Sequence, residues 1–109
     1  MKIKNIEIIN RINGLGAVAD LPLPVRLTYA IRKNARKLEM EYNDYFESLT
    51  ALKEKYQDDK ESPEYTKELN DLLNIEVDID FHMVPETMLE VVEFDITLQQ
   101  LAALDFMIE

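Results

Sequence analysis

The chain of 109 residues has no cysteine, no tryptophan, only two glycines and a single histidine. Without cysteine it can form neither a disulfide framework nor a thiolate centre, which fits a reducing compartment. It also lacks a signal-peptide pattern and any apolar run approaching the ~20 residues of a membrane-spanning helix. We therefore expect a single domain over residues 1–109 that stays in the cytoplasm and makes no contact with a membrane.

Sequence motifs for catalysis are missing as well. Gly14 and Gly16 superficially suggest a dinucleotide-binding loop, but the third glycine and the preceding strand are absent. No spacing marks a nucleophile beside an oriented general base, and there is no glycine-rich phosphate loop. The sequence therefore predicts a protein that is not an enzyme and requires no cofactor.

Charge is distributed unevenly along the chain. Residues 1–37 carry eight basic and two acidic side chains, a net charge of +6. Residues 38–109 carry four basic and twenty acidic ones, a net charge of −16. The total of −10 argues against direct binding of nucleic acid. The two halves are expected either to neutralise each other or to face different partners.

One stretch has a sustained helical period. Its apolar residues recur at intervals of four and three: Ile31, Ala35, Leu38, Tyr42, Tyr45, Leu49, Leu52 and Tyr56. This spacing is typical of a coiled-coil seam and predicts a helix from Pro24 to about Tyr56. Such a helix of ~33 residues is about 50 Å long at 1.5 Å per residue. A compact chain of this length has a radius of gyration of roughly 13 Å, so the helix needs a hairpin partner or another subunit.

We predict that this seam builds a homo-oligomer, most simply a dimer. The predicted seam residues are Ile31, Leu38, Tyr42, Tyr45, Leu49 and Leu52. The alternatives are that the chain's own third helix covers the same stripe, or that part of the stripe is exposed and binds a helix of another protein.

The segments on either side of the long helix predict shorter elements. Residues 4–19 have apolar side chains three and four apart and predict a helix, although the β-branched run in residues 1–9 also fits a strand. Residues 57–62 contain no apolar side chain and predict a mobile loop. Ser62 and Pro63 then begin a helix of about eleven residues that can fold back on the long one.

From Ile75 onward the apolar period changes to two. Residues 75–83 predict a half-buried strand, and Val92, Phe94 and Ile96 suggest a second one. Thr97 can cap a last helix over residues 98–108. The predicted fold class is mainly α with a small β-sheet (α+β). It consists of a long central coiled-coil-like helix, a helical hairpin, and C-terminal strands with a helix.

Three segments resemble small proteins of phages and prophages from Gram-positive gut bacteria. These segments are Leu23–Glu39, Glu68–Val77 and Ala103–Glu109, in the same order and covering about a third of the chain. The resemblance implies a phage origin, and thus the cytoplasm of the host bacterium. It implies no catalytic residue. Some small phage proteins block host immunity and others assist particle assembly, and the resemblance favours neither role.

Basic side chains cluster at the start of the long helix. With one tyrosine beside them, they are Arg26, Tyr29, Arg32, Lys33, Arg36 and Lys37. Positive charges there oppose the helix dipole, whose N-terminal end carries roughly +0.5 charge, and an incoming anion would reverse that cost. We interpret these residues as the binding site of a small anionic ligand, with Tyr29 as a stacking face. The alternative is that acidic residues of the chain or of a partner subunit neutralise the cluster.

A second polar group lies on one face of the strand predicted over residues 75–83. Glu76, Asp78, Asp80 and His82 alternate there, and carboxylates with an imidazole can hold a divalent cation. Alternate residues on a strand are ~6.6 Å apart, so only neighbouring pairs could share one ion. A solvated strand face accounts for the same pattern, and we predict no metal site.

These observations leave three hypotheses for function. The first is a non-enzymatic phage-encoded binding protein that counteracts host immunity by sequestering a small anionic nucleotide-type signal at the basic cluster. The second is an acidic inhibitor that binds a host protein by mimicking nucleic acid. The third is an oligomeric structural or assembly accessory protein of the phage.

Overall fold

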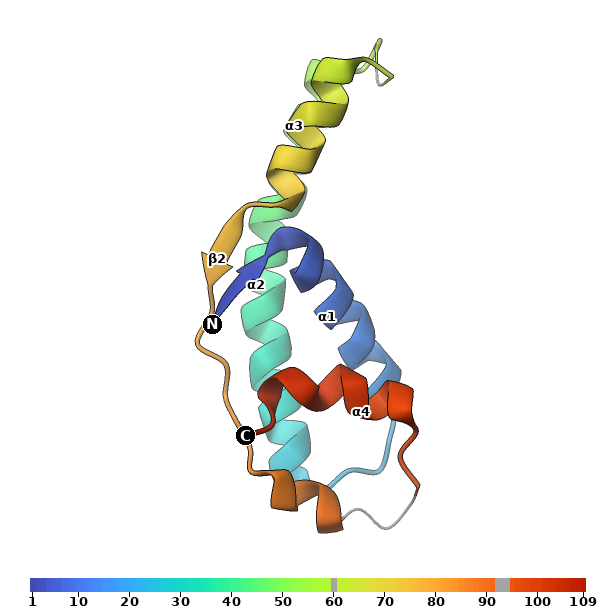
Figure 1. The fold of residues 1–109 in the computed structure, drawn as a ribbon, viewed down its shortest axis with the longest axis vertical. Helices are drawn as coiled ribbons and strands as arrows, with labels where there is room; N and C mark the ends of the chain where they lie inside the picture. Colours follow the sequence, from blue (N-terminus) through green and yellow to red (C-terminus); the bar gives the residue numbers. More distant parts are fainter. Residues whose placement is uncertain (60, 92–94) are drawn as a thin grey trace.

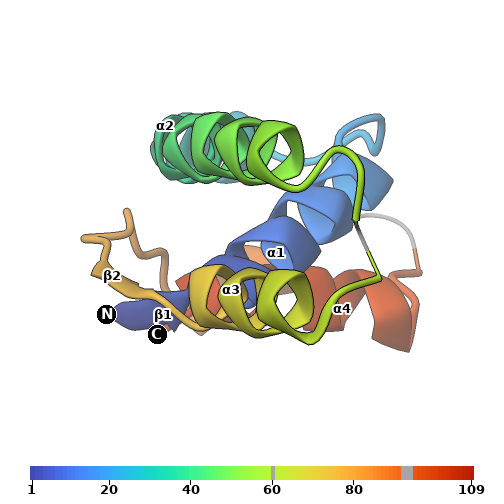
Figure 2. The ribbon, with the colours of Figure 1, turned by 90° about the horizontal axis from the view of Figure 1, so that it is seen from above.

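Helix α2 (Val25–Lys55) is the longest element of the molecule (Figure 1). The computed structural model describes residues 1–59, 61–91 and 95–109. Seen from above in Figure 2, helices α1 (Asn5–Val18), α3 (Pro63–Leu73) and α4 (Leu98–Leu104) all lie on the same side of α2. The described residues extend over 53 × 24 × 16 Å, because the far end of α2 and α3 project beyond the rest.

The predicted long helix is confirmed to within one residue at each end. Pro24 precedes it, and the Pro24 carbonyl accepts hydrogen bonds from the amides of Leu27 and Thr28. Lys53 and Lys55 lie in the last turn, where positive charge complements the helix dipole. None of the helices in the described ranges is long and apolar enough to cross a membrane.

The N-terminal segment combines the two predicted alternatives. Strand β1 (Lys2–Lys4) is followed directly by α1, whose start is fixed where the Lys4 amide donates to the Glu7 carboxylate over 3.3 Å. Strand β1 pairs antiparallel with β2 (Glu76–Asp78), so that Ile3 faces Val77. The small sheet therefore holds the N-terminal strand beside the segment that follows α3.

The strand predicted over residues 75–83 is shorter in the structure, because its partner strand has only three residues. Beyond β2 the chain stays extended along α2, and Ile79 and Phe81 are buried against the core. The second predicted strand is not observed at Ile96, and its residues 92 and 94 lie outside the described part of the chain.

Helix α3 folds back on the distal half of α2, as predicted. Its first turn is capped by the Ser62 hydroxyl, which accepts a hydrogen bond from the Tyr65 amide over 3.1 Å. Tyr56 and Tyr65 meet edge to face across the hairpin, with ring centroids 5.7 Å apart. The predicted loop 57–62 joins the two helices, and its residue 60 lies outside the described ranges.

The C-terminal helix is also shorter than predicted. Residues 86–91 form a 3-10 turn, and Thr97 caps α4 by accepting from the Gln100 amide. After Leu104 the chain makes a 3-10 turn and then pairs with Val84, whose amide donates to Met107 and whose carbonyl accepts from Glu109. These two 2.8 Å bonds end the helix before Ile108.

The core lies between α1, the first half of α2, residues 79–84 and the C-terminal turn. Its largest fully buried side chains are Ile3, Ile8, Val18, Leu27, Asn34, Leu38, Leu104 and Met107. Of the predicted oligomer seam, Ile31, Leu38 and Tyr45 are buried within the chain, while Tyr42, Leu49 and Leu52 are half-buried. The chain's own elements cover this stripe, so a second copy has to use another face of α2.

Candidate anion-binding site

The predicted ligand residues all lie on the first half of α2, but they do not converge on one point. Arg26, Arg32, Lys33 and Arg36 are exposed, and Tyr29 is 53% exposed. Lys37 is half-buried because its ammonium donates to the Asp80 carbonyl. Arg26, Tyr29 and Lys33 lie in one row, three and four residues apart, whereas Arg32 and Arg36 lie beside that row around the helix.

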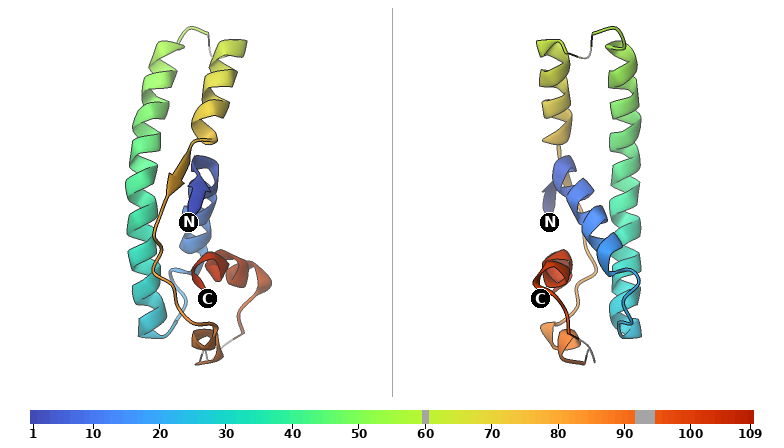
Figure 3. Two further views of the ribbon diagram at one scale, coloured as in Figure 1. Left: turned by 60° about the vertical axis from the view of Figure 1, so that its left-hand side comes forward. Right: turned by 90° about the vertical axis from the view of Figure 1, so that its right-hand side faces the viewer.

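A hollow of about 430 Å³ opens between the first turns of α2 and the segment 82–85. It is lined by Val25, Arg26, Tyr29, His82, Met83, Val84 and Pro85. Its lining therefore combines one guanidinium, two polar rings and an apolar remainder. Figure 3 shows the chain after β2 running alongside α2 to reach this place.

The wall formed by residues 82–85 is fixed from inside the protein. The side chain of Asn34, fully buried on α2, donates to the His82 carbonyl over 2.9 Å and accepts from the His82 amide over 2.7 Å. Two residues further on, the Val84 amide donates to the Met107 carbonyl, and the Val84 carbonyl accepts from the Glu109 amide. Because this wall is held at both places, the hollow is largely preformed.

The aromatic groups of the hollow contact each other and a cation. The rings of Tyr29 and His82 lie edge to face, with centroids 5.8 Å apart and planes at 80°. The Lys33 ammonium lies 5.2 Å from the centroid of the Tyr29 ring. Tyr29 therefore lies between the hollow and the Lys33 ammonium.

No carboxylate of the described residues forms a close ion pair with the basic cluster. Within residues 1–59, 61–91 and 95–109, ion pairs closer than 4.0 Å are limited to Met1 with Asp78 and Lys55 with Glu68. The first turn of α2 also contains no acidic side chain. The cluster and the positive end of the helix dipole thus add to one region of positive potential.

The polar residues of the predicted 75–83 strand do not form a metal centre. The Met1 ammonium donates to Asp78 over 2.9 Å and holds the pKa of that carboxyl below its usual range. His82 turns toward Tyr29. Across the described part of the chain, no three histidine or acidic side chains gather to hold an ion.

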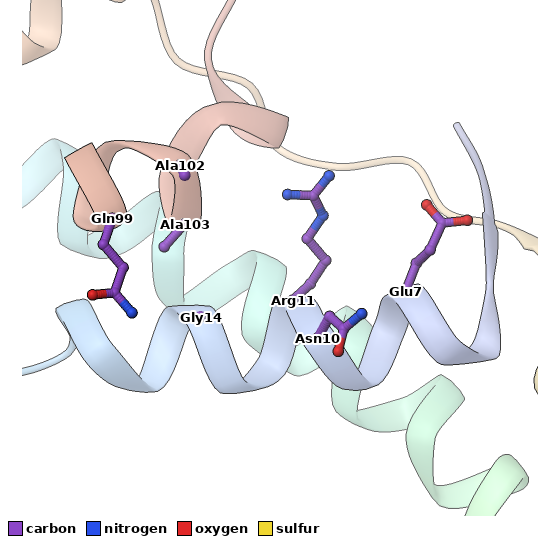
Figure 4. A pocket seen from close by; sticks show the side chains of 7 residues that line it. All are labelled: Glu7, Asn10, Arg11, Gly14, Gln99, Ala102 and Ala103. Atoms are coloured by element: carbon purple, nitrogen blue, oxygen red, sulfur yellow. The ribbon is translucent and has the colours of Figure 1, made fainter.

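A second hollow, of about 370 Å³, lies between α1 and α4 (Figure 4). Its lining residues are Glu7, Asn10, Arg11, Gly14, Gln99, Ala102 and Ala103. Gly14 permits the close approach of α4, since a Cβ atom there would lie 3.4 Å from the Cβ of Ala103. The Arg11 guanidinium lies over the Phe106 ring at 5.1 Å, and Glu7 adds a negative charge. This hollow is less suited to an anion than the one beside Tyr29.

No protein-family model, curated protein or solved structure matches this chain. The candidate site therefore stands on its own geometry.

Sequence reasoning missed the second wall of the hollow. It considered His82 only as a possible metal ligand, and it did not assign Met83, Val84 or Pro85 to a site. Asn34 carries the signal that could have found them, because it is a polar residue on the otherwise apolar inner face of α2. A buried asparagine requires hydrogen-bond partners, and an extended backbone segment supplies both a donor and an acceptor.

Proposed function

We propose that the protein is a non-enzymatic binding protein that captures a small anion carrying a planar ring, such as a nucleotide. The observation that carries this proposal is the preformed hollow, where Arg26, Tyr29 and His82 line a volume of about 430 Å³ without a carboxylate. Ligand sites in proteins typically have volumes of roughly 300–1,000 Å³, with a mainly apolar lining and few polar groups.

Each part of the hollow has a separate role in this proposal. Arg26 forms charge-assisted hydrogen bonds with the anionic group. Tyr29 and His82 contact the ring of the ligand, with the apolar side chains of residues 83–85 beneath it. The amides of Leu27 and Thr28 already donate to Pro24, so the arginine contributes more than the helix terminus.

The cations outside the hollow act over a longer range. Arg32, Lys33 and Arg36 raise the positive potential along α2 and favour the approach of an anion, whereas Lys37 holds the backbone of Asp80. In a protein with a net charge of −10, this local region is what makes anion binding feasible.

The biological role proposed here follows from the resemblance to phage proteins. A phage protein with such a site would act in the cytoplasm of the host bacterium, where it would sequester a nucleotide signal of host immunity. Binding alone suffices for that role, and it needs neither a nucleophile nor a metal.

The test is calorimetric titration of the purified protein with mononucleotides, cyclic nucleotides and inorganic phosphate. We expect a nucleotide to bind more tightly than phosphate, because only the nucleotide has a ring. Arg26→Gln removes charge-assisted hydrogen bonds that contribute about 1.5–3 kcal/mol each, which is a loss of about ten- to 150-fold in affinity.

The matched control is Lys67→Gln, which removes one exposed cation on α3 far from the hollow. Binding that is unchanged in this control and weakened in Arg26→Gln and Tyr29→Ala supports the proposal. Failure of every nucleotide to bind, or an equal loss in the control, refutes it.

A further inference from the structure

An exposed stripe of α2 carries an ordered charge pattern. Arg26, at its start, borders the hollow beside His82, and Met40 borders a smaller hollow against residues 78–80. Figure 2 shows helices α1, α3 and α4 on the other side of α2. Every seventh residue along its outer side is, in order, Arg26, Lys33, Met40, Glu47 and Glu54. All five are exposed, and Met40 is 70% exposed although it is apolar. Residues seven apart shift by only about 20° per repeat around a straight helix, so neighbouring members of the series share one side of it.

On this stripe, residues at equal distances before and after Met40 carry opposite charges. Two cations precede the methionine and two anions follow it at the same spacings. Arg36 and Asp44, each four residues from Met40, repeat the relation beside the stripe and are also exposed. None of these charged groups has an ion-pair partner among the described residues.

We propose that two copies of this protein pair through the outer sides of α2, antiparallel, about a twofold axis at Met40. In a twofold interface, each contact occurs twice with the roles exchanged. Lys33 then faces the partner's Glu47, Arg36 faces the partner's Asp44, and the two Met40 side chains meet at the axis.

The charges select this occupant and this direction. A parallel pair would place Lys33 beside Lys33 and Glu47 beside Glu47, and such like-charge contacts are unfavourable. An antiparallel copy neutralises both ends of the face at once. A purely acidic or a purely basic partner would match only one half of α2.

This surface is not the predicted coiled-coil seam, which the chain's own elements cover. The dimerisation proposed for it is also a separate function from ligand binding. Its central pairs, Lys33 with Glu47 and Arg36 with Asp44, do not line the hollow beside His82. Dimerisation and nucleotide binding are therefore tested by different substitutions.

The experiment uses two charge-reversed forms of the full chain. The negative form carries Lys33→Glu and Arg36→Glu, and the positive form carries Asp44→Lys and Glu47→Lys. Each form has four like charges on the outer side of α2, so each should be monomeric. Mixed in equal amounts, they should form a heterodimer, because every central pair again joins opposite charges: two pairs keep the wild-type signs and two have them exchanged.

Analytical ultracentrifugation at roughly 100 µM protein measures the association. We expect the wild type to dimerise at about 50 mM salt and to dissociate partly at about 500 mM, where screening is stronger. Lys67→Glu, on α3, is the matched control and should dimerise like the wild type. All substituted positions are exposed, and circular dichroism verifies that each form is folded.

Three results would overturn the proposal. They are a wild type that stays monomeric at low salt, reversed forms that self-associate like the wild type, and a mixture of the reversed forms that stays monomeric. None of them bears on the Arg26→Gln titration, so the two proposals can fail separately.

Discussion

The two halves of α2 have the same apolar spacing and different surroundings. Residues 25–42 pack against α1, the segment 79–84 and the C-terminal turn, and Leu27 and Leu38 are 0% exposed. Residues 46–55 pack mainly against α3, and Leu49 and Leu52 are only half-buried. Periodicity therefore determines which face of a helix is covered, whereas the number of elements packed against it determines how deeply its side chains are buried.

Tyr45 marks the boundary between the halves. It is the last buried residue of α2, and burial raises the pKa of its phenol. Helix α3, which covers the far half, has no fully buried side chain of its own. The α2–α3 hairpin is therefore held by contacts between half-buried side chains, by the Ser62 cap and by one ion pair. The other half of α2 is held by a continuous core.

The largest expected effect comes from truncating one leucine in each half. Leu38→Ala should lower the free energy of unfolding by about 2–5 kcal/mol, because it leaves a cavity in a packed core. Leu52→Ala should lower it by less than half as much, since its side chain is already partly in water. Urea denaturation measures both, and equal losses would contradict the comparison.

The polar contact in the core should have the next largest effect. Asn34→Ala leaves the amide and carbonyl of His82 without partners, at a cost of about 1–3 kcal/mol for each buried group. Thermal unfolding should show this loss, and the nucleotide affinity should fall because the wall at residues 82–85 loosens. Asn43→Ala, at an exposed position of the same helix, is the control with little expected effect.

The smallest expected effect concerns the ion pair of the hairpin. Lys55 donates to Glu68 over 3.1 Å and, with Tyr56, lowers the pKa of that carboxyl from its ordinary value of 4.5. A lowered pKa in the folded state stabilises the protein above pH 4.5, and this contribution disappears as the pH falls through the lowered value.

The wild type should therefore melt slightly above Glu68→Gln at neutral pH, and the difference should vanish in acid. Glu39→Gln, at an exposed position in the middle of α2 with no ion pair observed in the described residues, should show no such dependence. A difference that persists at low pH would mean that the pair does not act through charge.

The sequence predicts well the features that depend on neighbouring residues. The spacing of Ile31 to Tyr56 sets α2, and Ser62 with Pro63 sets the start of α3, because caps and periodicity act within a few residues. The length of β2 was not predictable in this way, since it depends on three residues at the other end of the chain. The end of α4 likewise depends on distant Val84.

The candidate site was half predictable for the same reason. Arg26, Tyr29 and Lys33 share a helix, and their proximity follows from local geometry. His82 reaches Tyr29 only because Asn34 holds a segment 48 residues away. The apolar period also could not reveal which elements would cover the stripe, because a helix of the same chain and a second copy satisfy it equally well.

Because α2 projects beyond the core, the distance between the two copies of a residue near its far end depends on the direction of the proposed pairing. Lys53 is exposed on the projecting half, thirteen residues from Met40. In an antiparallel pair centred on Met40, the two Lys53 backbones stand about 40 Å apart at 1.5 Å per residue. In a parallel pair they would lie about 10 Å apart, the spacing of packed helices. A pair of labels at this one position thus reads the direction of assembly as a length.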